Sequence, residues 1–230
     1  MGNLIVIESG TDGSGKATQS DILYKYLKSE GYKVRKLTYP NYGSRACSLV
    51  EMYLAGVFGE NPDDVNPYTV STFFAADRYA SFKTDWEDFY EDKDAIVIAD
   101  RYTTSNLICQ SAKFNSLKEI DSYVYWIEEL EYEKNNIPAP DLVIYLDLPV
   151  NFSLNMMVGR ENKMTGRLKK DIHESNEGYL RKCYKTSKYL SEKFGWKRVN
   201  CIDDNNKVKS IEAIAEEIKE ITTNFLSKNI

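Results

Sequence analysis

Short, almost uninterrupted apolar runs alternate along the chain with segments in which apolar residues recur every three or four positions. The runs predict strands at 4–8, 34–39, 95–100, 142–148 and 198–202. Nearly every residue in these runs is apolar, so we expect the strands to be covered on both faces, as in a parallel sheet.

The segments between the runs have helical periodicity. Apolar stripes at 22–27, 120–130 and 211–225 predict amphipathic helices, and Gly31 follows the first of them as a stop signal. Strands that alternate with helices imply crossover connections and a parallel sheet. We therefore predict an α/β fold with three layers, in which helices cover both faces of a five-stranded parallel sheet.

Composition and charge narrow the class of protein. The chain has 230 residues, 42% of them hydrophobic, which favours one domain over 1–230 with a sizeable core. Its net charge of −5 argues against a protein that coats nucleic acid. The apolar runs are too short to span a bilayer, so no membrane partner is expected. The four cysteines lack a paired spacing and are read as reduced thiols, which favours a cytoplasmic protein.

A glycine-rich loop follows the first predicted strand. Gly10, Gly15 and Lys16 have the spacing G-x-x-x-x-G-K between a strand and a helix. Such a loop wraps its backbone N–H groups around phosphates, the helix N-terminus adds partial positive charge, and the lysine contacts the outer phosphates. We expect Lys16 to be a surface charge. The predicted ATP-binding residues are Gly10, Asp12, Gly13, Ser14, Gly15, Lys16, Ala17 and Thr18.

Ala17 stands where such loops usually carry a serine or threonine that ligates Mg²⁺. The metal would then depend on Asp100, on phosphate oxygens and on water, which suits an ion that keeps much of its hydration shell. Asp100 is followed by Arg101 at the end of a predicted strand. A carboxylate beside a cation that clamps a second phosphate is what a small-molecule kinase requires, since its catalysis is mostly positioning and charge neutralisation.

Four stretches of the chain resemble the thymidylate kinases. They are GTDGSGKAT at 10–18, YPNYG at 39–43 with Arg45 close behind, FAADR at 74–78, and DRYTTSN at 100–106. A fifth, PDL at 140–142 with DLP at 147–149, is similar to a strand of the same family.

The resemblance implies a P-loop kinase fold, ATP with Mg²⁺ as donor, dTMP as acceptor and a homodimer. Phe74 would stack on the thymine, Arg78 and Asn106 would hydrogen-bond it, and Asp12 would contact the sugar. Apart from the resemblance, Phe74 and Arg78 lie one helical turn apart, where a ring and a planar donor suit a nucleobase. The predicted acceptor residues are Asp12, Tyr42, Arg45, Phe74, Arg78, Arg101, Asn106 and Gln110.

A basic segment at 160–170 interrupts the alternation of strands and helices, and we interpret it as part of a lid at about 159–174. With glycine at position 13, the loop offers only Lys16 to the migrating phosphoryl group, so the lid is expected to supply another cation. Arg160 and Arg167 are the candidates, because a guanidinium grips two phosphate oxygens at once. The predicted catalytic residues are Lys16, Asp100, Arg101, Arg160 and Arg167.

Two other functions stay open. Cys109 stands where many relatives have a tyrosine beside the 2′ position of the sugar, which favours a kinase for another nucleoside monophosphate. Ala17 favours a nucleotide-binding protein without catalytic activity.

Overall fold

Five parallel strands form the centre of the computed structural model, which describes residues 1–157 and 171–229. The strands are β1 (Asn3–Ser9), β2 (Lys33–Thr38), β3 (Ala95–Asp100), β4 (Leu142–Asp147) and β5 (Lys197–Asn200), in the order β2-β3-β1-β4-β5. The predicted α/β class and all five strands are confirmed. Most of the predicted lid, including Arg160 and Arg167, lies outside the described residues.

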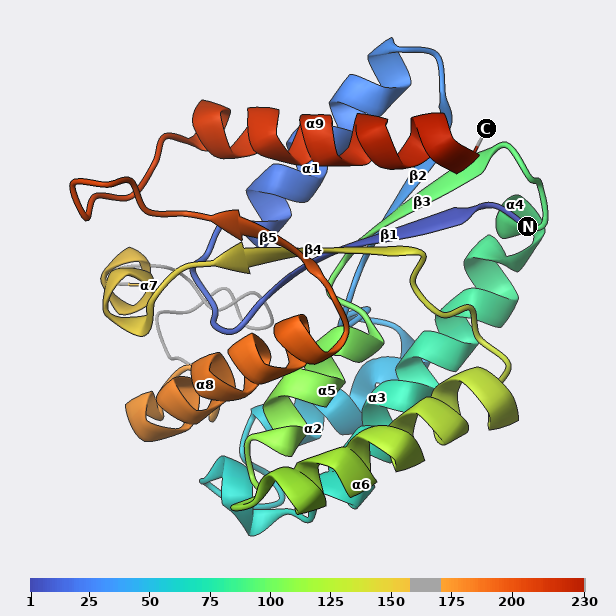
Figure 1. Ribbon diagram of the computed structural model, residues 1–230. Helices are drawn as coiled ribbons and strands as arrows, with labels where there is room; N and C mark the ends of the chain where they lie inside the picture. The colour runs from blue at the N-terminus through green and yellow to red at the C-terminus, as the bar shows by residue number, and fades with distance from the viewer. Residues whose placement is uncertain (158–170, 230) are drawn as a thin grey trace.

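Helices cover both faces of the sheet (Figure 1). On one face lie α1 (Lys16–Ser29) and α9 (Ile211–Asn229), and on the other lie α3 (Pro67–Ser81), α5 (Thr103–Ser111), α6 (Leu117–Glu128) and α8 (Glu177–Lys193). Successive residues of β1 point to opposite faces. Ile5 and Ile7 therefore join the core under α1 and α9, whereas Leu4 and Val6 join the core on the opposite side.

Two helices continue into wider π-helical turns. The turn Phe82–Trp86 extends α3, and the turn Glu129–Lys134 extends α6. A capping box of Ser116 and Glu119 starts α6. The stripe predicted at 120–130 thus extends past the end of α6, and its last residue lies in the π-helical turn, where the side chains point in other directions than in an α-helix.

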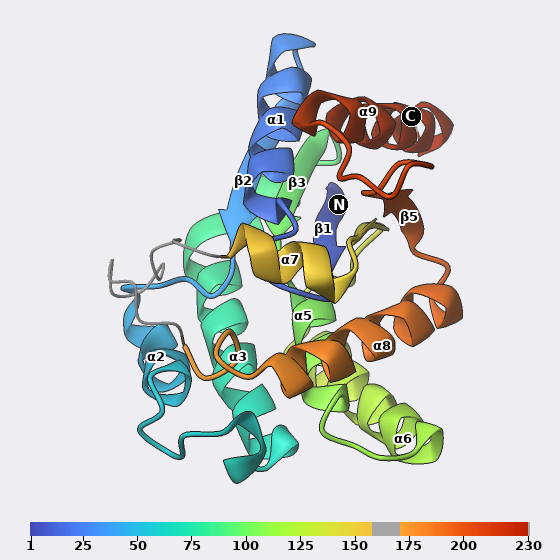
Figure 2. The same ribbon diagram turned by 90° about the vertical axis from the view of Figure 1, so that its left-hand side faces the viewer.

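The remaining helices are short. They are the 3₁₀ turns Arg45–Cys47 and Pro62–Asp64 and the helices α2 (Ser48–Leu54), α4 (Glu87–Tyr90) and α7 (Val150–Met156). Figure 2 looks onto the carboxyl edge of the sheet, where α7 lies between the layer of α1 and α9 and the layer of α3 and α8. Parallel α/β sheets bind ligands at this edge, beside the central strand where the order of connections reverses. Here that strand is β1.

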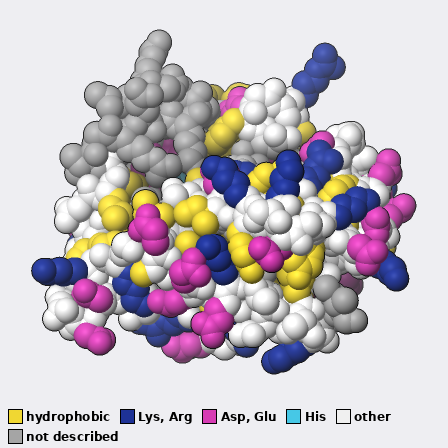
Figure 3. Space-filling view, turned by 90° about the horizontal axis from the view of Figure 1, so that it is seen from above, with side chains coloured by type: hydrophobic (Ala, Val, Ile, Leu, Met, Phe, Trp, Pro, Cys, Tyr) yellow, Lys and Arg dark blue, Asp and Glu magenta, His cyan; other side chains and the backbone are white. Residues whose placement is uncertain are grey.

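The surface of the α1 and α9 layer carries both signs of charge. Seen from above in Figure 3, lysine, arginine, aspartate and glutamate side chains intermingle over this face. In the described parts of the chain, every helix is too short or too polar to cross a membrane.

Candidate active site

The loop between β1 and α1 folds around the ammonium group of Lys16. Its Nζ donates to Ser9 Oγ at 2.6 Å and to the carbonyl oxygen of Thr11 at 2.9 Å, and the side chain is only 5% exposed. The expectation of a surface charge is therefore wrong. Loop oxygens hold the lysine inside the loop it serves, so its charge is pre-positioned at the place where phosphates would bind.

The two glycines of the motif meet different requirements. Gly15 has φ of 87° and precedes the first turn of α1 without a side-chain cap, which leaves backbone N–H groups available for an anion. Gly10 is required by close packing. A Cβ there would lie 2.2 Å from Ser187 Oγ and 2.9 Å from the Cα of Tyr184, both on α8.

A pocket opens beside this loop. Seven of the eight predicted ATP-binding residues line it, and Gly10 lies behind it against α8. The opposite wall is largely apolar, as an adenine ring requires. It consists of Leu148, Met156, Cys201, Val208, Lys209, Ile211 and Ile214. We call this the donor pocket.

Two carboxylates near the loop suit a magnesium ion. Asp12 lines the donor pocket, and Asp100 is buried at the end of β3. Among the described residues no group of three or more acidic, histidine or cysteine side chains forms a cage for a metal. One or two carboxylates with phosphate oxygens and water are the usual ligands of Mg²⁺ at nucleotide sites, so this donor set fits the ion.

Arg101 lies on the border between the donor pocket and a second pocket. It lines both, and its guanidinium forms an ion pair with Asp12 of the phosphate loop. The backbone of Arg101 has φ of 70°, in the left-handed region that non-glycine residues avoid, and its N–H donates to the carbonyl oxygen of Ile7 at 3.3 Å. Such strain persists where the surrounding structure enforces it, and it clusters at functional sites.

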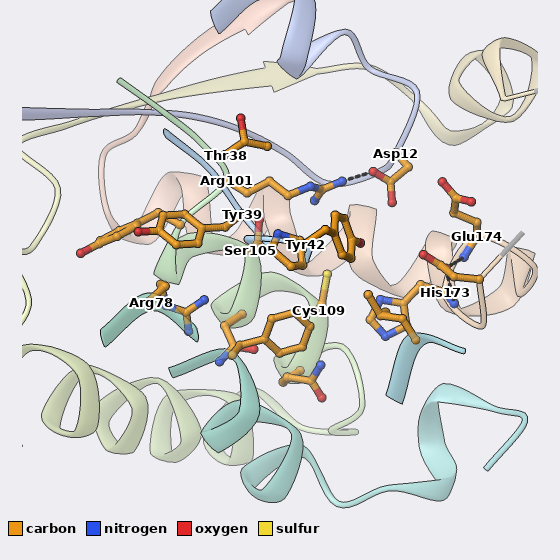
Figure 4. A pocket seen from close by; sticks show the side chains of 17 residues that line it. Asp12, Thr38, Tyr39, Tyr42, Arg78, Arg101, Ser105, Cys109, His173 and Glu174 are labelled. Carbon is orange, nitrogen blue, oxygen red and sulfur yellow. Dashed lines mark hydrogen bonds and ion pairs between the residues drawn. The ribbon is translucent and has the colours of Figure 1, made fainter. Parts of the chain in front are cut away.

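The second pocket, which we call the acceptor pocket, collects most of the predicted acceptor residues (Figure 4). Seven of them line it: Asp12, Tyr42, Phe74, Arg78, Arg101, Asn106 and Gln110. Arg45 is exposed and is not among the lining residues, so its contact with an acceptor phosphate stays a prediction.

An aromatic plate and two amides converge in the acceptor pocket. Phe74 from α3 is half-buried, and its ring meets Tyr53 edge-on at 6.5 Å. The amide of Asn106 on α5 is 3% exposed and makes no hydrogen bond to the described residues. Gln110, one turn further, lies within reach of the Tyr53 hydroxyl but forms no hydrogen bond of ordinary geometry there. Buried amides without partners are costly, so both are arranged for a polar ligand.

Asp77 holds the loop that carries Tyr42. Its carboxylate is 1% exposed and accepts hydrogen bonds from Asn41 N at 2.9 Å and from Ser44 Oγ at 3.3 Å. Burial raises the pKa of Asp77, although the hydrogen bond from Asn41 opposes this. Asp77 precedes Arg78 on α3, so the helical segment that fixes the loop also carries a residue predicted to bind the base.

Residues after the undescribed segment close the acceptor pocket. Asp171, His173 and Glu174 line it, and His173 Nε2 lies 2.9 Å from the Tyr53 hydroxyl. Burial raises the pKa of Asp171 to about 6, partly countered by a hydrogen bond from Glu174 N. Burial lowers the pKa of His173 to about 3, helped by the charges of Lys113 and Arg101. The imidazole is therefore neutral at pH 7.

Two buried acids that hold the surroundings of the site, Glu8 and Glu131, were not predicted from the sequence. Glu8 accepts from Thr104 Oγ1 at 2.7 Å and Ser105 Oγ at 2.6 Å, and so ties β1 to the start of α5. The one feature of the sequence that could have pointed to Glu8 is that it is a single acidic residue at the end of an apolar strand. Glu131, which pairs with Arg78, gave no signal, because it lies in the charged stretch 128–134.

Comparison with known proteins agrees with this geometry. The family model described as "Thymidylate kinase" matches residues 7–218. The thymidylate kinase of Plasmodium falciparum is 28% identical over 235 residues, which cover 98% of this chain and 96% of the relative. The Prochlorococcus marinus enzyme of that name is 29% identical, over 97% of this chain and 99% of the relative. The Mycobacterium tuberculosis enzyme is 29% identical, over 76% of this chain and 79% of the relative. The chain therefore belongs to the thymidylate kinase family.

Proposed function

We propose that this chain is a thymidylate kinase, which transfers the γ-phosphoryl group of ATP to dTMP and releases ADP and dTDP. Family membership supports the reaction. The observation that carries the proposal is that the donor and acceptor pockets adjoin and share two side chains, Asp12 and Arg101. Two nucleotides bound in these pockets would meet phosphate to phosphate at that border.

The roles of the residues follow from where they lie. Lys16 and the loop amides would bind the donor phosphates, and Arg101 with Tyr42 would hold the acceptor phosphate. Phe74 would stack on the base. Arg78, Asn106 and Gln110 would hydrogen-bond its edge. Asp12 would orient the sugar. The chemistry asked of the chain is mostly alignment of the two phosphates and neutralisation of the charge that develops on the migrating group.

Mg²⁺ would be held by Asp100 and Asp12, together with phosphate oxygens and water. When bound, it neutralises charge on the donor phosphates. The chain's own contribution is to hold these carboxylates near the phosphate loop, Asp100 by burial at the end of β3 and Asp12, until an acceptor phosphate binds, by its ion pair with Arg101.

We further propose that residues 159–174 form a lid over the single domain and that Arg160 or Arg167 supplies a catalytic cation. Arg160→Ala and Arg167→Ala test this, since at least one should reduce turnover at saturating substrates by about 10²-fold or more. Normal turnover in both would place the cation elsewhere.

A coupled assay of ADP release tests the function. The purified chain should phosphorylate dTMP with ATP and Mg²⁺ in preference to dCMP, dGMP and UMP. Lys16→Met should reduce turnover by about 10²- to 10³-fold, because one charged donor to the phosphates is lost. Lys25→Met, on the exposed side of α1, is the matched control and should behave like the wild type. A chain that binds ATP and dTMP without releasing ADP would be a non-catalytic nucleotide-binding protein.

A homodimer in the cytoplasm is also proposed. An apolar surface at α2 and the turn after it exposes Leu49, Met52, Val57 and Phe58, with Phe58 packed on Phe73 at 5.8 Å. A second copy of the chain would cover this surface. Sedimentation should give a dimer that Met52→Glu converts to a monomer. All four cysteines are free thiols, in keeping with a reducing compartment.

A further inference from the structure

Arg78 is a cation enclosed in the protein beside the acceptor pocket. It is 2% exposed, and burial of a charge without compensation is costly. Its compensation comes from Glu131, whose side chain is 0% exposed. Glu131 Oε1 accepts from Arg78 Nε at 3.1 Å and from Nη2, so the two charges form a buried ion pair.

The π-helical turn after α6 positions Glu131. In this turn Asn135 N donates to the carbonyl oxygen of Leu130 at 2.9 Å, which spans five residues instead of four. The hydroxyl of Tyr132 lies 2.6 Å from Thr103 Oγ1 and attaches the turn to the start of α5. Wide turns of this kind re-aim side chains and are frequent at functional sites.

The pair divides the guanidinium into two parts. Nε and Nη2 face Glu131, whereas Nη1 makes no hydrogen bond to any residue that the structure describes. Figure 4 shows the guanidinium of Arg78 on the side of the pocket where Ser105 lies, opposite the side that holds His173 and Glu174. Arginine only donates hydrogen bonds. The group it meets on a base must therefore be an acceptor, as a 4-oxo group is and a 4-amino group is not.

Glu131 itself does not line the pocket, and its Oε2 has no hydrogen-bond partner among the described residues. Within the described part of the chain, the hydrogen bonds and the ion pair of its side chain are formed with Arg78. Burial alone would lower the pKa of Arg78, but the adjacent Glu131 carboxylate raises it, so the pair also keeps the guanidinium charged.

We propose that Glu131 is a positioning residue for base selection: it fixes Arg78 so that the free side of the guanidinium accepts 4-oxo pyrimidines and rejects 4-amino pyrimidines. This rests on the proposed function, in that dTMP is the acceptor. Glu131 acts through Arg78 and contacts no substrate.

The test is Glu131→Gln, which keeps the shape of the side chain and removes its charge. The Michaelis constant for dTMP should rise about 10- to 100-fold, the range for one hydrogen bond to a charged group, and the ratio of dTMP to dCMP efficiency should fall by a similar factor. The Michaelis constant for ATP should stay within twofold, since neither Glu131 nor Arg78 lines the donor pocket. Glu129→Gln is the matched control. Glu129 belongs to the same turn but pairs with Lys134 at the surface, so the wild-type values should remain.

If Glu131→Gln does not fold, Glu131→Asp is decisive. The aspartate keeps the negative charge, but its side chain is one methylene shorter, so the carboxylate lies farther from Arg78. It should raise the Michaelis constant for dTMP by at least fivefold while turnover at saturation stays near the wild-type level. Wild-type selectivity in a folded variant would overturn the proposal, as would an equal loss of ATP and dTMP binding. Failure of the wild-type chain to phosphorylate dTMP would instead refute the proposed function, and dTMP binding by calorimetry would still test Glu131.

Discussion

The guanidinium of Arg101 and the carboxylate of Asp12 form an ion pair on the border of the two pockets, so the phosphate loop itself orients a residue of the acceptor side. The pair is partly exposed, at 17% and 26%, and both side chains can exchange this contact for a ligand. Binding of an acceptor phosphate would compete with Asp12 for Arg101 and release the carboxylate toward the sugar or the metal.

Arg101→Lys should lower the efficiency for dTMP by about 10- to 100-fold, because an ammonium keeps the charge but loses the planar fork that grips two oxygens. Steady-state kinetics with varied dTMP measure the effect. Arg181→Lys, in an exposed pair with Glu177 on α8, is the control and should change nothing. Equal efficiency in Arg101→Lys would mean that Arg101 serves the structure only.

Phe74→Ala should weaken dTMP binding by about 1–3 kcal/mol, the range for one base stacked on an aromatic ring, and leave ATP binding unchanged. Calorimetry with each nucleotide separates the two. The neighbouring Phe73 provides a control, because its ring packs on Phe58 and does not line the acceptor pocket. Loss of both nucleotides in Phe74→Ala, or equal loss of dTMP binding in Phe73→Ala, would show that the ring only fills the core.

Cys109 lines the acceptor pocket with a side chain much smaller than a tyrosine. A ligand that is excluded by a steric clash is admitted when the clashing group is absent. We therefore expect measurable phosphorylation of UMP, reduced in Cys109→Tyr while activity on dTMP persists. If the wild-type enzyme does not phosphorylate UMP, another side chain excludes the 2′-hydroxyl, and His173, which also lines the pocket, is the first to replace.

His173 should make the protein less stable in acid. Burial lowers the pKa of His173 from the ordinary 6.5 of a histidine to about 3 in the folded chain, so its contribution to stability is complete above pH 6.5 and declines as the pH falls toward 3. Between pH 7.5 and 5 the free energy of unfolding should fall by about 2 kcal/mol through this group. Urea unfolding of wild type and His173→Gln at both pH values isolates the difference.

Asp171 acts in the opposite direction over the same interval. Burial raises its pKa from the ordinary 3.8 of an aspartate to about 6, which adds stability that is complete below pH 3.8 and is lost as the pH rises through 6. The total pH dependence therefore understates the effect of His173, and only the difference between wild type and variant measures it. An identical pH dependence in the two proteins would contradict a neutral, buried imidazole.

The sheet and the phosphate loop could be predicted because their signals are local. Apolar runs mark buried strands, and a strand, a glycine motif and a helix follow one another within the first 29 residues. The order β2-β3-β1-β4-β5 left no local trace, since it depends on which crossover each helix makes. Phe74 and Arg78 could be paired from their helical spacing.

Contacts that depend on the folded path of the chain, and leave no local pattern in the sequence, explain what was missed. Lys16 was expected at the surface because a lysine is usually solvated, but loop oxygens of Ser9 and Thr11 enclose it. Glu131 lies 53 positions from Arg78 and contacts it from a π-helical turn. The periodicity of apolar residues in α6 does not predict such a turn. His173 meets Tyr53 across 120 positions of the chain.

Because Gly10 packs against α8, the phosphate-loop motif cannot be grafted into another protein as a short segment by itself. Tyr184 and Ser187 stand behind the loop, and both are tied to β4, through Asp147 at 2.8 Å and Tyr145 at 2.7 Å. The curvature of the loop therefore depends on packing against α8, a helix that is not part of the motif. A chimera that receives residues 9–18 alone would contain the motif but lack the helix that shapes its loop. The smallest unit that keeps the loop conformation is the loop together with the middle of α8 and the residues of β4 that hold α8.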